Sequence, residues 1–244
     1  MTLFKKRKTP PLGNQAAKTL TTTTGKLTVS IPATLAEVTI GQMIALQQNP
    51  NLGDIEAISI LSGIPVEELQ NVKSMDDFAI FGEAVLSLSH EIKNLYNSDD
   101  IPKKVTFSAG KTVTVASNLS VEPVGAFMAA REIMGDEISA HIKLYGDEDW
   151  QQNFNPSLKA CCQVLAHYFY CRATGKPYNE YEAEEFTAEI QKLGVTEALP
   201  IAKHFFTCYP SLSKPKTGFF HRLLHRSNER LVYKHSKSLN ISIP

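Results

Sequence analysis

The side chains with the clearest capacity for chemistry are three cysteines and a histidine that lie close together in the chain, at Cys161, Cys162, His167 and Cys171. Thiolate and imidazole groups are good zinc ligands, and His167 and Cys171 would share one face of a helix. Adjacent residues on a helix, however, point about 100° apart, so Cys161 and Cys162 cannot both complete one tetrahedral site. The surrounding residues are apolar in nearly every direction, which predicts a central core helix over 155–174 and no metal site.

Two other spacings resemble catalytic or nucleotide-binding motifs, but each lacks a required residue. His221 and His225 have the spacing of the metalloprotease H-E-x-x-H motif, yet Arg222 stands where the general-base glutamate is needed. Gly110-Lys111-Thr112 resembles the end of a phosphate-binding loop, yet Val105 occupies the position of its first glycine. Because strand pattern lies on both sides of Gly110, we expect a plain hairpin turn there.

A third candidate is an acidic cluster made of Glu180, Glu182, Glu184 and Glu185. Paired carboxylates can carry acid and base catalysis, but acids in the first turn of a helix are also the ordinary complement to its dipole. We favour the second interpretation. No Ser, His and Asp set is linked by spacing, which leaves nucleophilic catalysis unsupported rather than excluded. The sequence predicts a protein that is not an enzyme, with no catalytic residues, no metal and no cofactor; an enzyme whose site is not legible in one sequence is the alternative from another class.

The charged residues are sorted by position along the chain. Residues 1–25 carry five Lys or Arg and no acid, and residues 210–244 carry seven against Glu229 alone. Because the whole chain sums to zero with 25 bases and 25 acids, residues 26–209 hold 13 bases and 24 acids, a net charge near −11. An acidic body with two basic extensions indicates binding partners rather than chemistry.

The elements that would position these residues are mostly helical, so we predict a single α+β domain with a small antiparallel sheet of three strands. Alternating apolar residues predict a strand over 26–31, and a hairpin over 104–116 would pair with it. Thr39 and Gln42 form a capping-box pattern at the start of a helix. Further helices are predicted over 55–61, 74–94, 120–134, 155–174, 179–193 and 196–209.

The chain therefore divides into a basic flexible arm (1–25), an acidic mostly helical body (26–209) and a basic C-terminal extension (210–244). The segment 219–233, which we call the 219–233 segment throughout, has the pattern of an amphipathic helix. We predict that it binds an apolar groove with an acidic rim, either on the same body or on a neighbouring copy, and nucleic acid is the alternative partner. Its predicted partner-binding residues are apolar on one side and basic on another: Phe220, Leu224, Leu231 and Val232, and Arg222, Arg226 and Arg230.

Membrane and secretory functions are not expected. The longest apolar-rich stretch, 160–171, is interrupted by Gln163 and His167 and falls short of the roughly 18 residues that a span needs. No apolar run follows the first basic residues, so we expect no signal peptide. The four cysteines lack the spacing of a disulfide framework, which favours a reducing cytosol.

The order of segments over residues 26–209 resembles that of the small tailed-phage proteins called tail assembly chaperones. The resemblance lies in five stretches that match in order and hydrophobicity: Leu27-Thr28-Val29-Ser30-Ile31-Pro32, Glu37-Val38-Thr39-Ile40-Gly41-Gln42, Leu61-Ser62-Gly63-Ile64-Pro65, Leu119-Ser120-Val121-Glu122-Pro123-Val124-Gly125 after a hairpin, and Glu197-Ala198-Leu199-Pro200-Ile201-Ala202-Lys203-His204-Phe205-Phe206.

This resemblance implies a mostly helical, non-enzymatic protein in the cytoplasm of the infected bacterium. It would bind the tape-measure protein and tail-tube subunits during assembly, and self-association is consistent with it. The basic extension after Pro210 departs from the compact pattern of that group. The alternative is therefore a structural virion protein of the neck, tail or packaged contents, whose basic tails bind neighbouring subunits or DNA.

Overall fold

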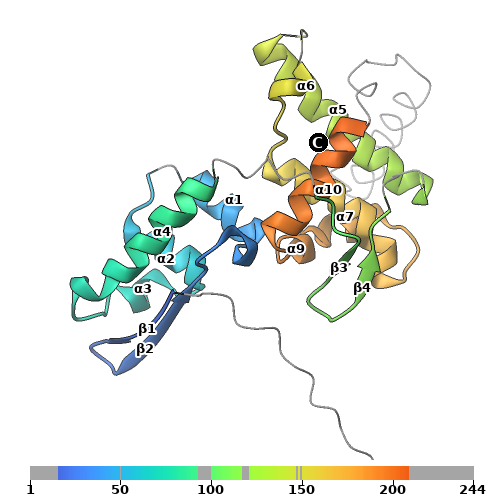
Figure 1. Ribbon diagram of the computed structural model, residues 1–244. Helices are drawn as coiled ribbons and strands as arrows, with labels where there is room; N and C mark the ends of the chain where they lie inside the picture. Colours follow the sequence, from blue (N-terminus) through green and yellow to red (C-terminus); the bar gives the residue numbers. More distant parts are fainter. Residues whose placement is uncertain are drawn as a thin grey trace, which may run out of the picture.

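The computed structural model describes residues 16–49, 51–92, 100–116, 121–146, 148 and 150–208 (Figure 1). The first part of the chain, at the lower left of Figure 1, comprises β1 (Ala16–Thr21), β2 (Lys26–Ile31), the 3₁₀ turn η1 (Leu35–Glu37), α1 (Ile40–Gln48), α2 (Asp54–Ser62), α3 (Val66–Leu69), the 3₁₀ turn η2 (Met75–Phe78) and α4 (Ala79–Ile92). The second part comprises β3 (Lys104–Thr106), β4 (Thr112–Thr114), α5 (Val124–Tyr145), α6 (Trp150–Asn153), α7 (Leu158–Thr174), α8 (Glu180–Glu185), α9 (Thr187–Ile190) and α10 (Val195–Cys208). The predicted α+β, mostly helical class is confirmed.

Residues 16–24 form ordered structure, so the prediction of a flexible arm over 1–25 is wrong for this part; residues 1–15 lie outside the described ranges. β1 pairs antiparallel with β2, with Leu20 opposite Leu27 and fully buried. The threonine-rich turn that follows is bonded to the loop after α3, since Thr23 N donates to Asn71 O at 3.0 Å and Lys73 N to Thr21 O at 3.0 Å. Threonine also favours extended backbone, so the polar run is ordered by partners some fifty residues away.

The mid-chain hairpin does not join the first strand, so the single three-stranded sheet was also wrong. β3 pairs only with β4, in a separate two-stranded sheet, and Val105 and Val113 are its buried face. Gly110 adopts a φ of 78° in the turn and donates its N–H to Phe107 O at 2.8 Å, as a tight hairpin turn requires. The predicted hairpin at Gly110-Lys111-Thr112 is confirmed. It covers α7, where Phe107 stacks edge-on against Phe169.

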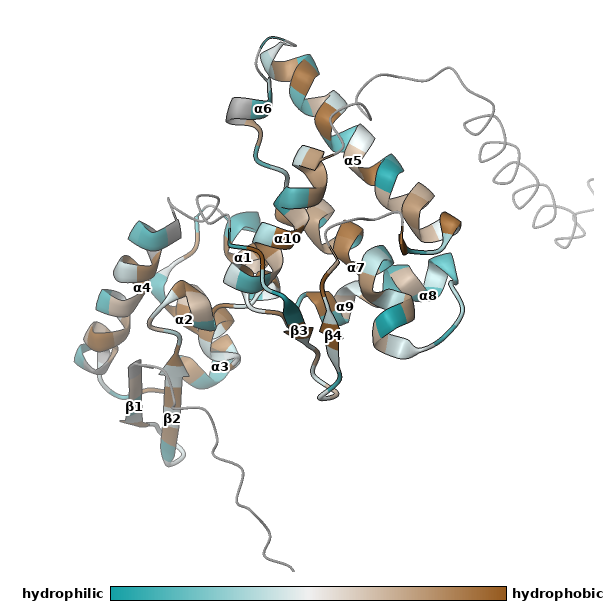
Figure 2. Ribbon diagram, turned by 45° about the vertical axis from the view of Figure 1, so that its right-hand side comes forward, coloured by the Kyte–Doolittle hydropathy of each residue, from teal (hydrophilic) through white to brown (hydrophobic). Residues whose placement is uncertain are grey.

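Helix α7 is the centre of the core, as its all-round apolar sequence predicts. Eleven of its residues are buried, and α1, α5, α8, α9, α10 and β4 pack around it. Ser157 caps its start by accepting a hydrogen bond from Ala160 N, and Gly175, at a φ of 76°, ends it. The helix thus begins at Leu158, three residues later than predicted, because the N-cap fixes the first turn. Figure 2 shows apolar residues along the helices that face this centre.

The two parts of the chain share one hydrophobic core. At their junction, Val195 N donates to Val38 O at 2.8 Å, and Gly41 N donates to Gln191 O at 2.9 Å. A Cβ at position 41 would lie 3.1 Å from that carbonyl oxygen, so a larger residue would fit only if Gln191 shifted by a few tenths of an ångström. The predicted capping box is confirmed, because Thr39 and Gln42 exchange both side-chain to backbone bonds. This junction positions the first part against α7, α9 and α10.

We predict that Leu165→Ala lowers the free energy of unfolding by about 2–5 kcal/mol, because Leu165 is fully buried in α7 and its loss leaves a cavity. The measurement is the urea midpoint followed by circular dichroism. Leu144→Ala is the matched control, since Leu144 is 77% exposed and its truncation should change stability by less than about 0.5 kcal/mol. An unchanged midpoint for Leu165→Ala would place α7 outside the core.

Candidate functional site

The predicted partner-binding residues, Phe220, Arg222, Leu224, Arg226, Arg230, Leu231 and Val232, lie outside the described ranges, as do His221 and His225. The candidate site must therefore be built from the residues that the structure describes between 16 and 208. We consider first the groups with chemical capacity and then the surface.

The cysteines of α7 are placed as core residues. Cys161 and Cys162 are fully buried, and burial raises the pKa of the Cys161 thiol well above its usual value and that of Cys162 to about 12. Burial also raises the pKa of Cys171, which is only partly buried. A reactive cysteine needs a lowered pKa, so all three environments disfavour a nucleophilic thiolate.

His167 is held in the core by a tyrosine. Its ring is 3% exposed, and Tyr178 Oη lies 3.0 Å from Nδ1, across the space between α7 and the start of α8. Burial lowers the pKa of His167, so the imidazole is neutral at physiological pH. Its Nδ1 atom has a partner in Tyr178 Oη and does not require a metal or substrate. Within the ranges that the structure describes, no three His, Cys, Asp or Glu side chains come together in an arrangement that could hold a metal ion.

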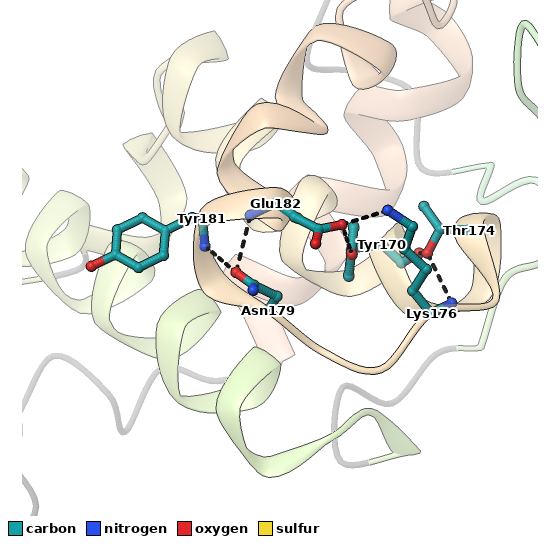
Figure 3. Close-up of polar contacts among 6 residues, drawn as sticks. All are labelled: Tyr170, Thr174, Lys176, Asn179, Tyr181 and Glu182. Atoms are coloured by element: carbon teal, nitrogen blue, oxygen red, sulfur yellow. Dashed lines mark hydrogen bonds and ion pairs between the residues drawn. The ribbon is translucent and has the colours of Figure 1, made fainter.

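The acidic cluster lies on α8, where Asn179 caps the start of the helix and Glu182 forms an ion pair with Lys176. Figure 3 shows Glu182 between two partners: its Oε2 accepts from Tyr170 Oη at 2.6 Å and from Lys176 Nζ at 2.7 Å. The hydrogen bond from Lys176 is the main reason that the pKa of Glu182 lies below its usual value. Asn179 caps the helix by accepting from the backbone of Tyr181 and Glu182. Its lowered pKa and its two partners make Glu182 a structural group and a poor general acid or base.

A partly buried ion pair joins α5, α7 and the end of β4. Glu122 Oε1 lies 2.5 Å from an Arg172 terminal nitrogen, and the Glu122 side chain is only 3% exposed. Arg172 also donates to Thr114 O at 3.2 Å and lies over the Tyr168 ring, 5.2 Å from its centre. Tyr168 Oη in turn bonds both the N–H and the carbonyl of Ala116. This network fixes where α5 begins relative to α7.

The distinctive surface feature is a set of large apolar side chains exposed at both ends of α5. At its start, Val121 and Val124 are 55% and 76% exposed, and Tyr181 on the adjoining α8 is 66% exposed. We call these three residues the α5–α8 patch. At its other end, Leu144 and Tyr145 are 77% and 75% exposed, and we call this pair the α5 tip. The α5 tip lies at the top of the molecule beside α6 in both ribbon views (Figure 1, Figure 2).

Sequence reasoning missed both surfaces. A valine after Pro123 and a Leu-Tyr pair at the end of a helix look like ordinary core positions. Only the packing of the structure shows that these side chains are left exposed. A shallow open hollow of about 390 Å³ also lies between α1 and α2, lined by small and apolar residues such as Gly41, Ala45 and Ile60.

Comparison with known proteins does not assign the chain to a family. No protein-family model, no curated protein and no solved structure matches the chain. Among the described residues, no helix is both long and apolar enough to cross a bilayer. The site is therefore argued from geometry alone.

We predict that Arg172→Met destabilises the protein by about 2–3 kcal/mol near neutral pH, because it leaves the Glu122 carboxylate buried without its partner; the range is reduced for the partial exposure of Arg172. Burial already raises the pKa of Glu122, opposed by the charge and hydrogen bond of Arg172, so removing Arg172 raises it further. In the folded variant Glu122 then binds a proton more readily than in the unfolded chain. The loss in free energy of unfolding relative to the wild type therefore becomes smaller as pH falls through the raised pKa.

The matched control is the double variant Glu122→Gln/Arg172→Met, in which no buried charge remains. Urea titrations from pH 4.5 to 8 should show it more stable than Arg172→Met at pH 8 and similar to it at the acidic end. A loss in Arg172→Met that is independent of pH and equal to that of the double variant would contradict the role given to Glu122.

Proposed function

We propose that this protein is a non-enzymatic assembly protein of a tailed phage, which binds structural subunits such as the tape-measure and tail-tube proteins in the cytoplasm of the infected bacterium. The observation that carries the proposal is the α5 tip, where Leu144 and Tyr145 are about three-quarters exposed. Three acids follow after Gly146 in the sequence, at 147–149. An exposed apolar surface bordered by charge is typical of a protein-binding site.

Three further observations support binding rather than catalysis. The thiols of α7 have raised pKa values, His167 is neutral and bonded to Tyr178, and Glu182 is paired with Lys176. Each of these groups is thus occupied in holding the fold. The excess of acids in residues 26–209 complements a basic partner surface.

A structural virion protein of the neck, tail or packaged contents is the second candidate. The basic compositions of 1–25 and 210–244 favour it, because basic tails can bind neighbouring subunits or DNA in a finished particle. The two candidates differ in whether the protein stays in the virion.

The proposed function predicts that the protein is abundant in infected cells and missing from finished particles. Quantitative mass spectrometry of particles purified from the virus that encodes it, compared with infected-cell lysate, measures both. The major tail-tube protein in the same samples is the internal control. A fixed copy number per particle would replace the chaperone with the structural alternative.

We also predict that Leu144→Ser/Tyr145→Ser weakens co-purification of phage structural proteins at least about tenfold, because it removes the apolar contact at the α5 tip. Leu86→Ser is the matched control, since Leu86 is 64% exposed on α4 in the other part of the chain. Both variants should keep the wild-type urea midpoint. If the tip variant retains full co-purification, or the control loses as much, the α5 tip is not the binding surface.

A further inference from the structure

The α5–α8 patch is a platform made by two elements that pack against each other. Tyr178 connects them: its ring lies so close to Gly125 that a Cβ there would come within 2.6 Å of Cε1, and it precedes Tyr181 by three residues. Val124 is the neighbour of Gly125 in the first turn of α5. Figure 3 shows Tyr181 pointing away from the Glu182 cluster, on the opposite side of α8. Its exposed ring therefore has no role in that cluster.

The border of this patch is acidic. Glu180, Glu184 and Glu185 are exposed on α8; burial raises the pKa of Tyr178, and the charges of Glu180 and Glu184 add to this shift. Two cations on this side are engaged elsewhere, because Arg172 pairs with Glu122 and Lys176 with Glu182. The patch is thus an apolar surface with a net negative rim. A basic amphipathic segment is the occupant that it fits.

This chain contains such a segment, 219–233. Its sequence places Phe220, Leu224, Leu231 and Val232 on one side of a helix and Arg222, Arg226 and Arg230 on another. An apolar stripe of this kind is not buried by a solitary helix, and its three arginines against Glu229 give it a net positive charge. The chemistry of the segment therefore matches that of the patch.

The chain between α10 and the 219–233 segment is long enough for the segment to reach the α5–α8 patch of the same molecule. α10 ends at Cys208, and Phe205, three residues earlier, stacks on Tyr168 with ring centres 4.8 Å apart. Tyr168 is one helical turn before Arg172, which pairs with Glu122 beside Val121. Residues 209–218 span up to about 33 Å when extended, whereas the whole of α7 is about 25 Å long. Tethering also gives the segment an effective concentration that a separate copy would lack.

We propose that the 219–233 segment docks on the α5–α8 patch of its own molecule, with its apolar side on Val121, Val124 and Tyr181 and its arginines facing Glu180 and Glu184. This contact goes beyond the proposed function and does not depend on it. It makes the patch a recognition site for basic amphipathic helices, which a partner carrying such a helix would reach by displacing the segment.

The test is limited digestion of the full-length protein by trypsin, with mass spectrometry of the cuts after Arg222, Arg226 and Arg230. Cleavage tracks the undocked population, so we expect Val124→Ser/Tyr181→Ser to speed these cuts at least about tenfold. Glu180→Gln/Glu184→Gln should speed them less, and added sodium chloride should speed them in the wild type and hardly in this variant. Leu86→Ser is the matched control and should leave the rate unchanged.

The substituted side chains are exposed, so each variant should keep the wild-type circular dichroism spectrum in native buffer, and this is checked on the same samples. The rates should also be independent of protein concentration. The proposal is overturned if the patch variant and Leu86→Ser digest at the same rate, or if protection of the segment appears only as the protein concentration rises, which would assign the contact to a second copy. Neither result bears on whether the protein binds phage subunits through the α5 tip.

Discussion

The described fold depends on one requirement: α7 is apolar in nearly every direction and must be covered over most of its surface, with Lys159 among its few exposed residues. A helix of this kind is stable in water only when other elements surround it. Its two fully buried cysteines and its aromatic residues, among them Tyr168 and Phe169, are reached by α5, α10, the β3–β4 hairpin and the first part of the chain. The remaining contacts follow from this burial. The Glu122–Arg172 pair fixes α5 at one end of α7, and the Val38–Val195 and Gly41–Gln191 bonds bring in residues before α4.

The same burial decides what the chemically capable side chains can do. Cysteine, histidine and tyrosine on α7 are the residues a catalytic site would use, but here their pKa values move away from reactive values because they are removed from water. The carboxylates of Glu122 and Glu182 are held by Arg172 and Lys176. Valine, leucine and tyrosine side chains at the two ends of α5, in contrast, face solvent. The contrast between the buried polar groups of α7 and these exposed apolar groups is the physical basis for proposing a binding protein.

Features whose cause is local could be predicted from the sequence, and features whose cause is distant could not. The all-round apolar pattern of α7, the Thr39–Gln42 capping box and the Gly110 turn each depend on a few neighbouring residues, and the structure has all three. The threonine run at 21–24 was misassigned because its order comes from hydrogen bonds to residues 71–73. The hairpin was paired with the wrong element because strand pairing is set by the surface that each face must cover, and this hairpin covers α7 through β4 and Phe107. The exposed patches escaped notice because exposure of a valine or tyrosine is a property of the packing around it.

The central claim is that Cys161, Cys162 and His167 of α7 are enclosed in the core and become accessible only when the protein unfolds. The most direct test is labelling of the four free cysteines with a thiol reagent across a urea titration, read residue by residue by mass spectrometry. Cys208, exposed at the end of α10, should label at once in native buffer. Cys161 and Cys162 should label only with the global unfolding seen by circular dichroism, at the same urea midpoint. Rapid labelling of Cys161 or Cys162 in native buffer would contradict the account and return α7 to the list of candidate active sites.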